Sequence, residues 1–130
     1  MLRAIFWLLL AAASGNATAE WNKVTELEAG SLYVEPASIQ SNGGVVKMRS
    51  LYDLNSAIVS KSNGKPYASQ NLQGEYDCRK AQWRPLDFSW YSERMGEGKM
   101  VEHLSDTFRW EPIPAGTGVE MLWKLACGGR

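Results

Sequence analysis

The chain has 130 residues, with 14 basic and 14 acidic side chains, so its formal net charge is zero. This balance excludes the bulk positive charge with which many proteins bind nucleic acids or anionic membranes. The length suits one domain with a single modest core.

The first nineteen residues have the pattern of a secretory signal peptide. Arg3 provides the positive start, residues 4–13 form an unbroken apolar run, and an A-x-A cleavage site ends at Ala19. A bilayer span needs about 20 apolar residues, so the run favours a cleaved signal over an uncleaved membrane anchor. We therefore predict a signal peptide at residues 1–19.

The predicted mature domain covers residues 20–130. It begins with Glu20 rather than the cysteine that bacterial lipid attachment requires. Without Arg3 the domain has 13 basic and 14 acidic residues. We expect a periplasmic or secreted protein with no membrane anchor after cleavage and no nucleic acid as partner.

Most of the mature domain alternates apolar and polar residues between turn signals, which is typical of strands. We expect six antiparallel strands, at residues 21–27, 31–35, 45–53, 67–78, 81–91 and 99–110. Asn42-Gly43 and Asn63-Gly64 suit tight hairpin turns. Residues 54–61 either extend the third strand or form a loop, and Pro85 indicates an edge or a bulge.

The alternation also predicts which side chains share a face. Within residues 45–53, Val46, Met48, Ser50 and Tyr52 should meet the core, whereas Lys47, Arg49 and Asp53 should meet water. In the next strand Leu72, Gly74, Tyr76 and Cys78 fall on one face. Cys78 is therefore expected on the apolar side of the sheet.

A C-terminal helix is predicted from the spacing of Val119, Leu122, Trp123 and Ala126, which places them on one side of a helix. Thr117 can cap its start and Gly128 can end it. A helix of about three turns is marginal alone in water, so it must pack on the sheet. The fold class is therefore α+β, an antiparallel sheet with one helix.

The two cysteines, Cys78 and Cys127, are far apart in the sequence. In an oxidising compartment this favours a structural disulfide over a reactive or metal-binding thiol pair. Such a bond would tie the end of the helix to the sheet.

The sequence gives little support for catalysis or for metal binding. His103 is the single histidine, and its neighbours Ser105 and Asp106 lie along the same strand, where they cannot converge on one point as a triad must. One histidine and two disulfide sulfurs do not make a zinc site. The acidic residues form no pair that sequence places for acid–base work. We expect no catalytic residues, no metal, no cofactor and no enzymatic activity.

Five tryptophans remain after cleavage: Trp21, Trp83, Trp90, Trp110 and Trp123. Most are expected in the core. The alternative is a sheet face that holds an apolar ligand or a partner, with Trp83, Trp90 and Trp123 beside a crevice between helix and sheet.

One segment concentrates cations beside an indole: Arg79, Lys80, Trp83 and Arg84. A solvated bend explains it most simply. As a candidate binding site, it would dock onto an acidic or sulfated macromolecule, because arginine beside tryptophan suits interfaces.

The order of several elements resembles the surface-adhesin protein E family of Gram-negative bacteria. The matching elements are Trp21, Tyr33-Val34-Glu35 with Ser38-Ile39, the strand at 45–54, Tyr76-Asp77-Cys78, Tyr91-Ser92, Met95-Gly96-Glu97-Gly98, Val101 and the stretch from Trp110 to Thr117 leading to Cys127. They cover nearly the whole mature domain.

The resemblance implies a six-stranded antiparallel sheet whose C-terminal helix is tied to the concave face by a disulfide. It also implies a non-enzymatic binding module for host extracellular-matrix or envelope macromolecules, with a protein or glycan partner and a homodimer. The founding adhesin is a lipoprotein, whereas this chain has no acceptor cysteine after Ala19. The alternative function is a periplasmic carrier that holds a small apolar ligand between helix and sheet.

Overall fold

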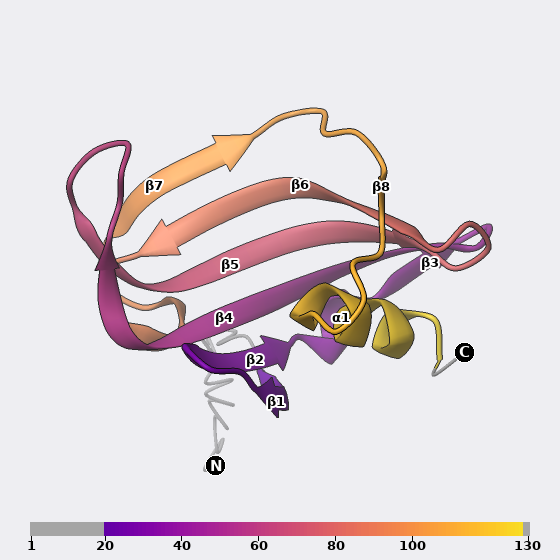
Figure 1. The fold of residues 1–130 in the computed structure, drawn as a ribbon, viewed down its shortest axis with the longest axis horizontal. Coiled ribbons are helices and arrows are strands. Elements are labelled where there is room, and N and C mark those ends of the chain that lie inside the picture. The colour runs from indigo at the N-terminus through magenta and orange to yellow at the C-terminus, as the bar shows by residue number, and fades with distance from the viewer. Residues whose placement is uncertain (1–19, 129–130) are drawn as a thin grey trace, which may run out of the picture.

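The computed structural model describes residues 20–128, and the predicted signal peptide lies outside them. One antiparallel sheet is covered on one face by a C-terminal helix (Figure 1). Its main strands, in spatial order, are β1 (Asn22–Glu26), β2 (Gly30–Val34), β4 (Val45–Val59), β5 (Pro66–Asp77), β6 (Gln82–Tyr91) and β7 (Met100–Ser105). The predicted sheet of six antiparallel strands is confirmed.

Shorter elements complete the chain. Strand β3 (Gln40–Asn42) pairs with β4, and β8 (Glu111–Pro112) pairs with β6. Two single 3-10 turns, η1 (Pro36–Ser38) and η2 (Arg94–Gly96), interrupt the connections, and the helix α1 spans Gly118–Ala126.

Two strand boundaries differ from the sequence-based expectation. Strand β4 continues to Val59, so most of residues 54–61 extend the strand, with a register break between Asp53 and Ile58. The predicted last strand is wrong in its second half, because β7 ends at Ser105. Residues 111 and 112 instead pair with the far end of β6.

Pro85 lies at a bulge, as one reading of the sequence expected. Gln73 pairs with Asp87 and Gly74 with Pro85, so Leu86 is an extra residue on β6. Proline cannot donate to a strand ladder, and a bulge is one of the few places within a sheet that tolerate it.

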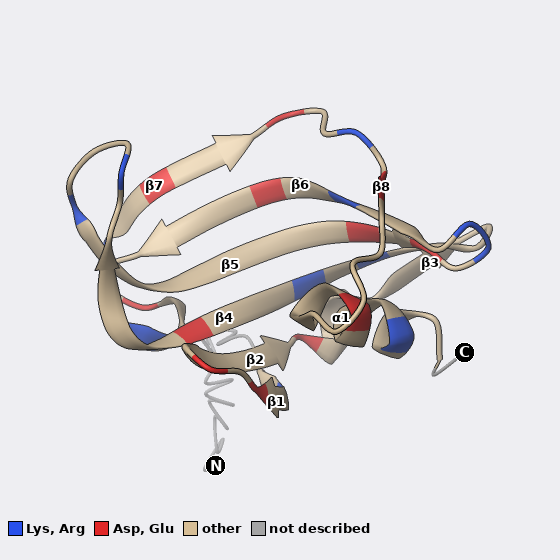
Figure 2. Ribbon diagram, viewed as in Figure 1, with Lys and Arg blue, Asp and Glu red and all other residues tan. Residues whose placement is uncertain are grey.

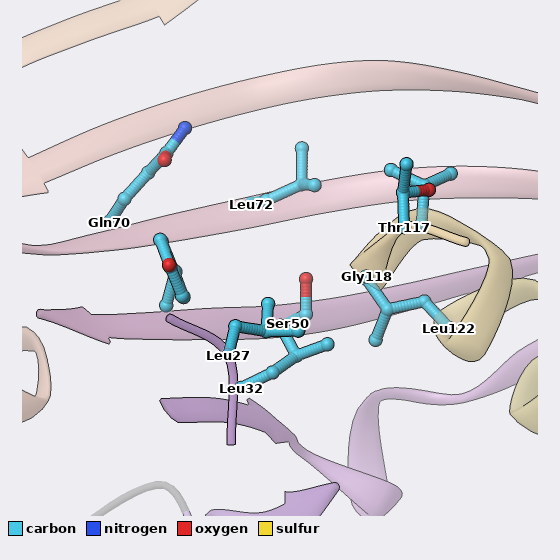
Figure 3. A pocket seen from close by; sticks show the side chains of 10 residues that line it. Leu27, Leu32, Ser50, Gln70, Leu72, Thr117, Gly118 and Leu122 are labelled. Carbon is cyan, nitrogen blue, oxygen red and sulfur yellow. The ribbon is translucent and has the colours of Figure 1, made fainter. Parts of the chain in front are cut away.

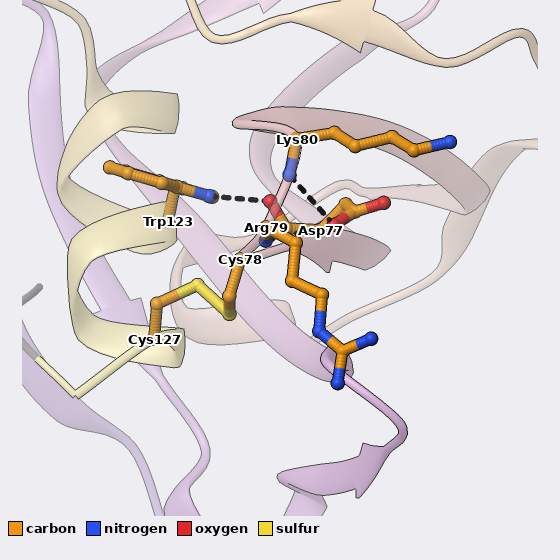
Figure 4. Close-up of a disulfide and its surroundings, with 6 residues drawn as sticks. All are labelled: Asp77, Cys78, Arg79, Lys80, Trp123 and Cys127. Carbon is orange, nitrogen blue, oxygen red and sulfur yellow. Dashed lines mark hydrogen bonds between the residues drawn. A yellow bond between two sulfur atoms is a disulfide. The ribbon is translucent and has the colours of Figure 1, made fainter.

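The helix begins and ends as predicted. The Thr117 hydroxyl accepts a hydrogen bond from the Glu120 amide, and Gly128 follows with φ +72°. Cys127, at the end of α1, forms a disulfide with Cys78, directly after β5 (Figure 4). The Trp123 indole nitrogen also donates to the Asp77 carbonyl over 2.9 Å. The helix end is therefore tied to the sheet covalently and by a hydrogen bond.

We call the sheet surface under α1 the helix face and the opposite surface the back face. The core on the helix face consists of Leu32, Val34, Met48, Tyr76 and Leu122. Trp83 and Trp123 pack against it but stay partly exposed. Trp21, Trp90 and Trp110 are not among the residues that pack on this core. The expectation that most tryptophans lie in the core is therefore wrong, and residues of β2, β4, β5 and α1 fill it instead.

The alternation suggested that the whole back face meets water, but part of it is buried. Leu51 and Asp53 are buried, because η2 and its flanking loop fold over this end of β4. The expectation that Asp53 meets water is therefore wrong. The contact joins residues about 40 positions apart, which local alternation does not reveal.

Candidate functional site

The turn between β5 and β6, residues 78–81, presents two of the four predicted binding residues. Arg79 and Lys80 are exposed, and the backbone amides of both donate to the Asp77 carboxylate, over 3.0 and 3.1 Å. Figure 2 shows basic residues at this turn and, at the opposite end of the sheet, in the turn between β4 and β5. The β5–β6 turn is anchored to the end of α1, since Cys78 within it forms the disulfide.

Trp83 and Arg84 point to opposite faces of the sheet. Trp83 stacks on Tyr76 of the core, with ring centroids 6.5 Å apart. Arg84 forms an ion pair of 2.9 Å with Glu75 and lies 4.5 Å from the centre of the Trp110 ring. The structure therefore brings together only Arg79 and Lys80.

An apolar pocket of about 190 Å³ opens between the start of α1 and the helix face (Figure 3). Its lining consists of Leu27, Leu32, Ser50, Tyr52, Gln70, Leu72, Thr117, Gly118, Val119 and Leu122. The pocket is larger than the engineered cavity of about 150 Å³ that binds benzene, and smaller than most drug-sized sites. It can hold a small ring or a short alkyl chain.

Sequence reasoning expected this crevice but assigned it the wrong residues. Trp83, Trp90 and Trp123 do not line it. Gly118 marks its position, because a Cβ there would lie within 3.4 Å of the Leu27 and Leu32 side chains. The available sequence signal was a glycine in the first turn of a helix whose neighbouring positions are mostly apolar.

His103 contacts Asp87 on the neighbouring strand, with 2.7 Å between Nε2 and Oδ2. The Ser89 hydroxyl donates to the other oxygen of Asp87 over 3.5 Å, and Ser89 is the register partner of His103 across β6 and β7. Within residues 20–128, no three histidine, cysteine or acidic side chains are grouped to hold a metal ion.

In this part of the chain no helix has the length and apolarity needed to cross a bilayer. A search of curated proteins by sequence finds no match.

Solved structures with the same fold come from Haemophilus influenzae protein E. One matches with a TM-score of 0.60 and 12% identity, covering 82% of this chain and 83% of that one. A second crystal form matches at 0.57 and 13%, covering 75% and 80%. Protein E from a non-typeable strain matches at 0.56 and 12%, covering 82% and 75%. The family model described as Surface-adhesin protein E matches residues 21–128. The chain therefore belongs to the surface-adhesin protein E family.

Proposed function

We propose that the mature chain is an exported, non-enzymatic binding module that docks onto a macromolecule of the host extracellular matrix or of the cell envelope. Membership of a surface-adhesin family supports an adhesin-type role. The observation that carries the proposal is the β5–β6 turn, where Arg79 and Lys80 are exposed directly after a disulfide-bonded cysteine. A turn that is already ordered loses little conformational entropy on binding.

The partner surface that this turn suits is acidic or sulfated. Arg79 and Lys80 are adjacent cations, and the Asp77 carboxylate beside them accepts hydrogen bonds from their backbone amides. Their attraction to a partner is screened by salt, so the affinity should fall as ionic strength rises.

Charge reversal at the two ends of the sheet tests the proposal. Binding to immobilised heparin, to purified matrix proteins and to cell-envelope extract is measured for Arg79→Glu/Lys80→Glu and for a matched control, Lys61→Glu/Lys65→Glu, in the β4–β5 turn. We expect at least a tenfold loss for the first variant and little change for the control. Binding to none of these probes, or equal losses in both variants, would contradict the proposal.

Export and assembly are part of the same proposal. A chain secreted through a signal peptide should begin at Glu20, which N-terminal sequencing of the native protein determines. The homodimer implied by the family resemblance stays a prediction, and sedimentation equilibrium of the mature domain tests it.

The apolar pocket supports a second function, that of a carrier for a small apolar ligand. Its lining comes from β2, β4, β5 and the first turns of α1. Native mass spectrometry of protein purified from its own periplasm should detect a bound small molecule. Val119→Phe, which fills the pocket, should abolish the adduct, whereas Met121→Phe on the exposed side of α1 should keep it. A ligand-free native protein would refute the carrier.

A further inference from the structure

We propose that the back face binds a short, uncharged saccharide in two adjoining polar hollows that run along β4 and β5. This site lies on the opposite surface from α1 and uses neither the β5–β6 turn nor the apolar pocket. The proposal therefore does not depend on either of the functions proposed above.

The first hollow crosses three strands and has a volume of about 160 Å³. Arg49, Gln73 and Asp87 are register partners across β4, β5 and β6, and Asn71 and Ser89 form the next row. Tyr91 completes the lining. Because paired residues point to the same face, these side chains stand side by side and line one hollow.

Of the two charged groups in the hollow, Asp87 has a close partner and Arg49 has only a distant one. Asp87 binds His103, and the Arg49 guanidinium lies 4.0 Å from the Glu35 carboxylate. The side-chain amides of Asn71 and Gln73, in contrast, make no hydrogen bond to any other residue among 20–128, although both are half-buried. The groups left for a ligand are therefore neutral amides and partly occupied carboxylate oxygens.

These groups suit a ligand that carries hydroxyls, such as a sugar. A sugar hydroxyl donates one hydrogen bond and accepts others, and a side-chain amide offers both a donor and an acceptor. Arg49 and Asp87 put one charge of each sign in the lining, so a ligand with a strong net charge would meet repulsion as well as attraction. Tyr91 adds the aromatic surface on which the apolar face of a pyranose ring packs.

A second hollow, of about 350 Å³, continues the first along the strands. Lys47 and Glu75 in its lining lie two residues beyond Arg49 and Gln73, a step of about 6.7 Å. Arg84, paired with Glu75, lies over the ring of Trp110, which also lines the hollow. Two hollows, each with an aromatic wall, fit a ligand of two or more sugar rings. Lys47 leaves the second hollow with one positive charge in excess, so the uncharged ligand is inferred from the amides of the first.

NMR of the mature domain tests the site directly. The probes are neutral mono- to tetrasaccharides of glucose, galactose and N-acetylglucosamine, with zwitterionic amino acids and heparin as the comparison ligands. We expect a neutral oligosaccharide to shift the side-chain amide signals of Asn71 and Gln73. The Gln70 amide, on the same strand but the helix face, should stay unchanged. The proposal would be overturned if these two amide signals shifted only with the amino acids or only with heparin. It would also be overturned if they shifted with none of the probes.

Variants supply an independent measurement. By isothermal titration, Asn71→Ala/Gln73→Ala should lower saccharide affinity at least tenfold, while Gln70→Ala should not. Arg79→Glu/Lys80→Glu should also retain saccharide binding, which separates a failure here from a failure of the docking role. Equal losses of saccharide affinity in the Gln70 and Asn71/Gln73 variants would refute the site. If the double variant does not fold, the amide shifts of the native domain decide whether the site exists.

Discussion

At the scale of single residues, Asp53 holds a loop against the back face. One carboxylate oxygen accepts from the Arg94 guanidinium and the other from the Met95 amide, both over 2.7 Å. Met95 has φ +58°, a conformation that non-glycine residues rarely adopt. Ser69 adds two bonds, donating to the Glu93 carbonyl and accepting from the Gly96 amide. Two buried polar side chains thus fix the unusual backbone of η2.

Asp53→Ala should lower the free energy of unfolding by about 2 kcal/mol, because the Met95 amide loses its acceptor. Arg94 contributes little to that figure, since its side chain is mostly exposed. Denaturant unfolding measures the loss, and hydrogen exchange should show faster opening at Met95 and Gly96. Asp53→Asn, which keeps an acceptor oxygen, should lose less. Unchanged exchange in the alanine variant would contradict this role.

Tyr76 is the fully buried aromatic residue of the core, and its hydroxyl makes no hydrogen bond of good geometry within the described residues, although the Ser50 side chain lies near enough to oppose the effect of burial. Burial raises the pKa of this phenol well above its ordinary value. Below about pH 10 both the folded and unfolded states keep the proton, so Tyr76 adds no pH dependence there. At higher pH only the unfolded state releases the proton, so stability is lost as pH rises.

Tyr76→Phe should therefore flatten the alkaline decline in stability, which for this one group reaches about 1.4 kcal/mol per pH unit above pH 10. Near pH 7 the variant should be at least as stable as the native chain, because it no longer buries a hydroxyl that lacks a well-formed hydrogen bond. Urea unfolding from pH 7 to 11.5 compares the two. Parallel curves over the alkaline range would show that the phenol does not titrate as described.

At the scale of elements, the pairing of β2 with β4 depends on close backbone approach at Gly30. Gly30 pairs with Leu54, and a Cβ at Gly30 would lie 2.2 Å from the Asp53 carbonyl oxygen. No side chain can be inserted without separating the strands, and neighbouring Asp53 is the residue that holds η2.

Gly30→Ala should destabilise the fold by about 3 kcal/mol, because backbone atoms cannot move away as a flexible side chain could. Differential scanning calorimetry would show a lowered midpoint. Amide exchange should rise first along β1 and β2, the strands on the outer side of the contact. A midpoint within a degree of the native value would refute the close approach.

The sequence predicted those elements whose signals are local. Alternation placed Tyr76 and Cys78 on one face, and the spacing from Val119 to Ala126 predicted the helix that meets them, so the disulfide followed. Leu51 and Asp53 were missed because a distant loop buries them. The four predicted binding residues were separated because alternation within β6 sends Trp83 and Arg84 to opposite faces. The polar hollows depend on register across three strands, which no single segment encodes.

At the scale of the whole molecule, one sheet carries three separate surfaces: the charged β5–β6 turn, the apolar pocket beside α1 and the polar back face. The helix defines two of them, because it forms the pocket wall and Cys127, the residue that follows it, is bonded to the turn. Their geometry depends on α1 staying in place. The account therefore rests on the Cys78–Cys127 bond.

The bond closes a loop of 49 residues, for which the chain-entropy model gives about 4 kcal/mol of stabilisation. That is a large part of the stability of an ordinary domain, about 5–15 kcal/mol. The most direct test is guanidinium unfolding of the natively exported chain beside Cys78→Ala/Cys127→Ala, followed by the fluorescence of its tryptophans. We predict a loss of about 4 kcal/mol in the free energy of unfolding. Equal stability of the two proteins would contradict a helix held to the sheet by this bond.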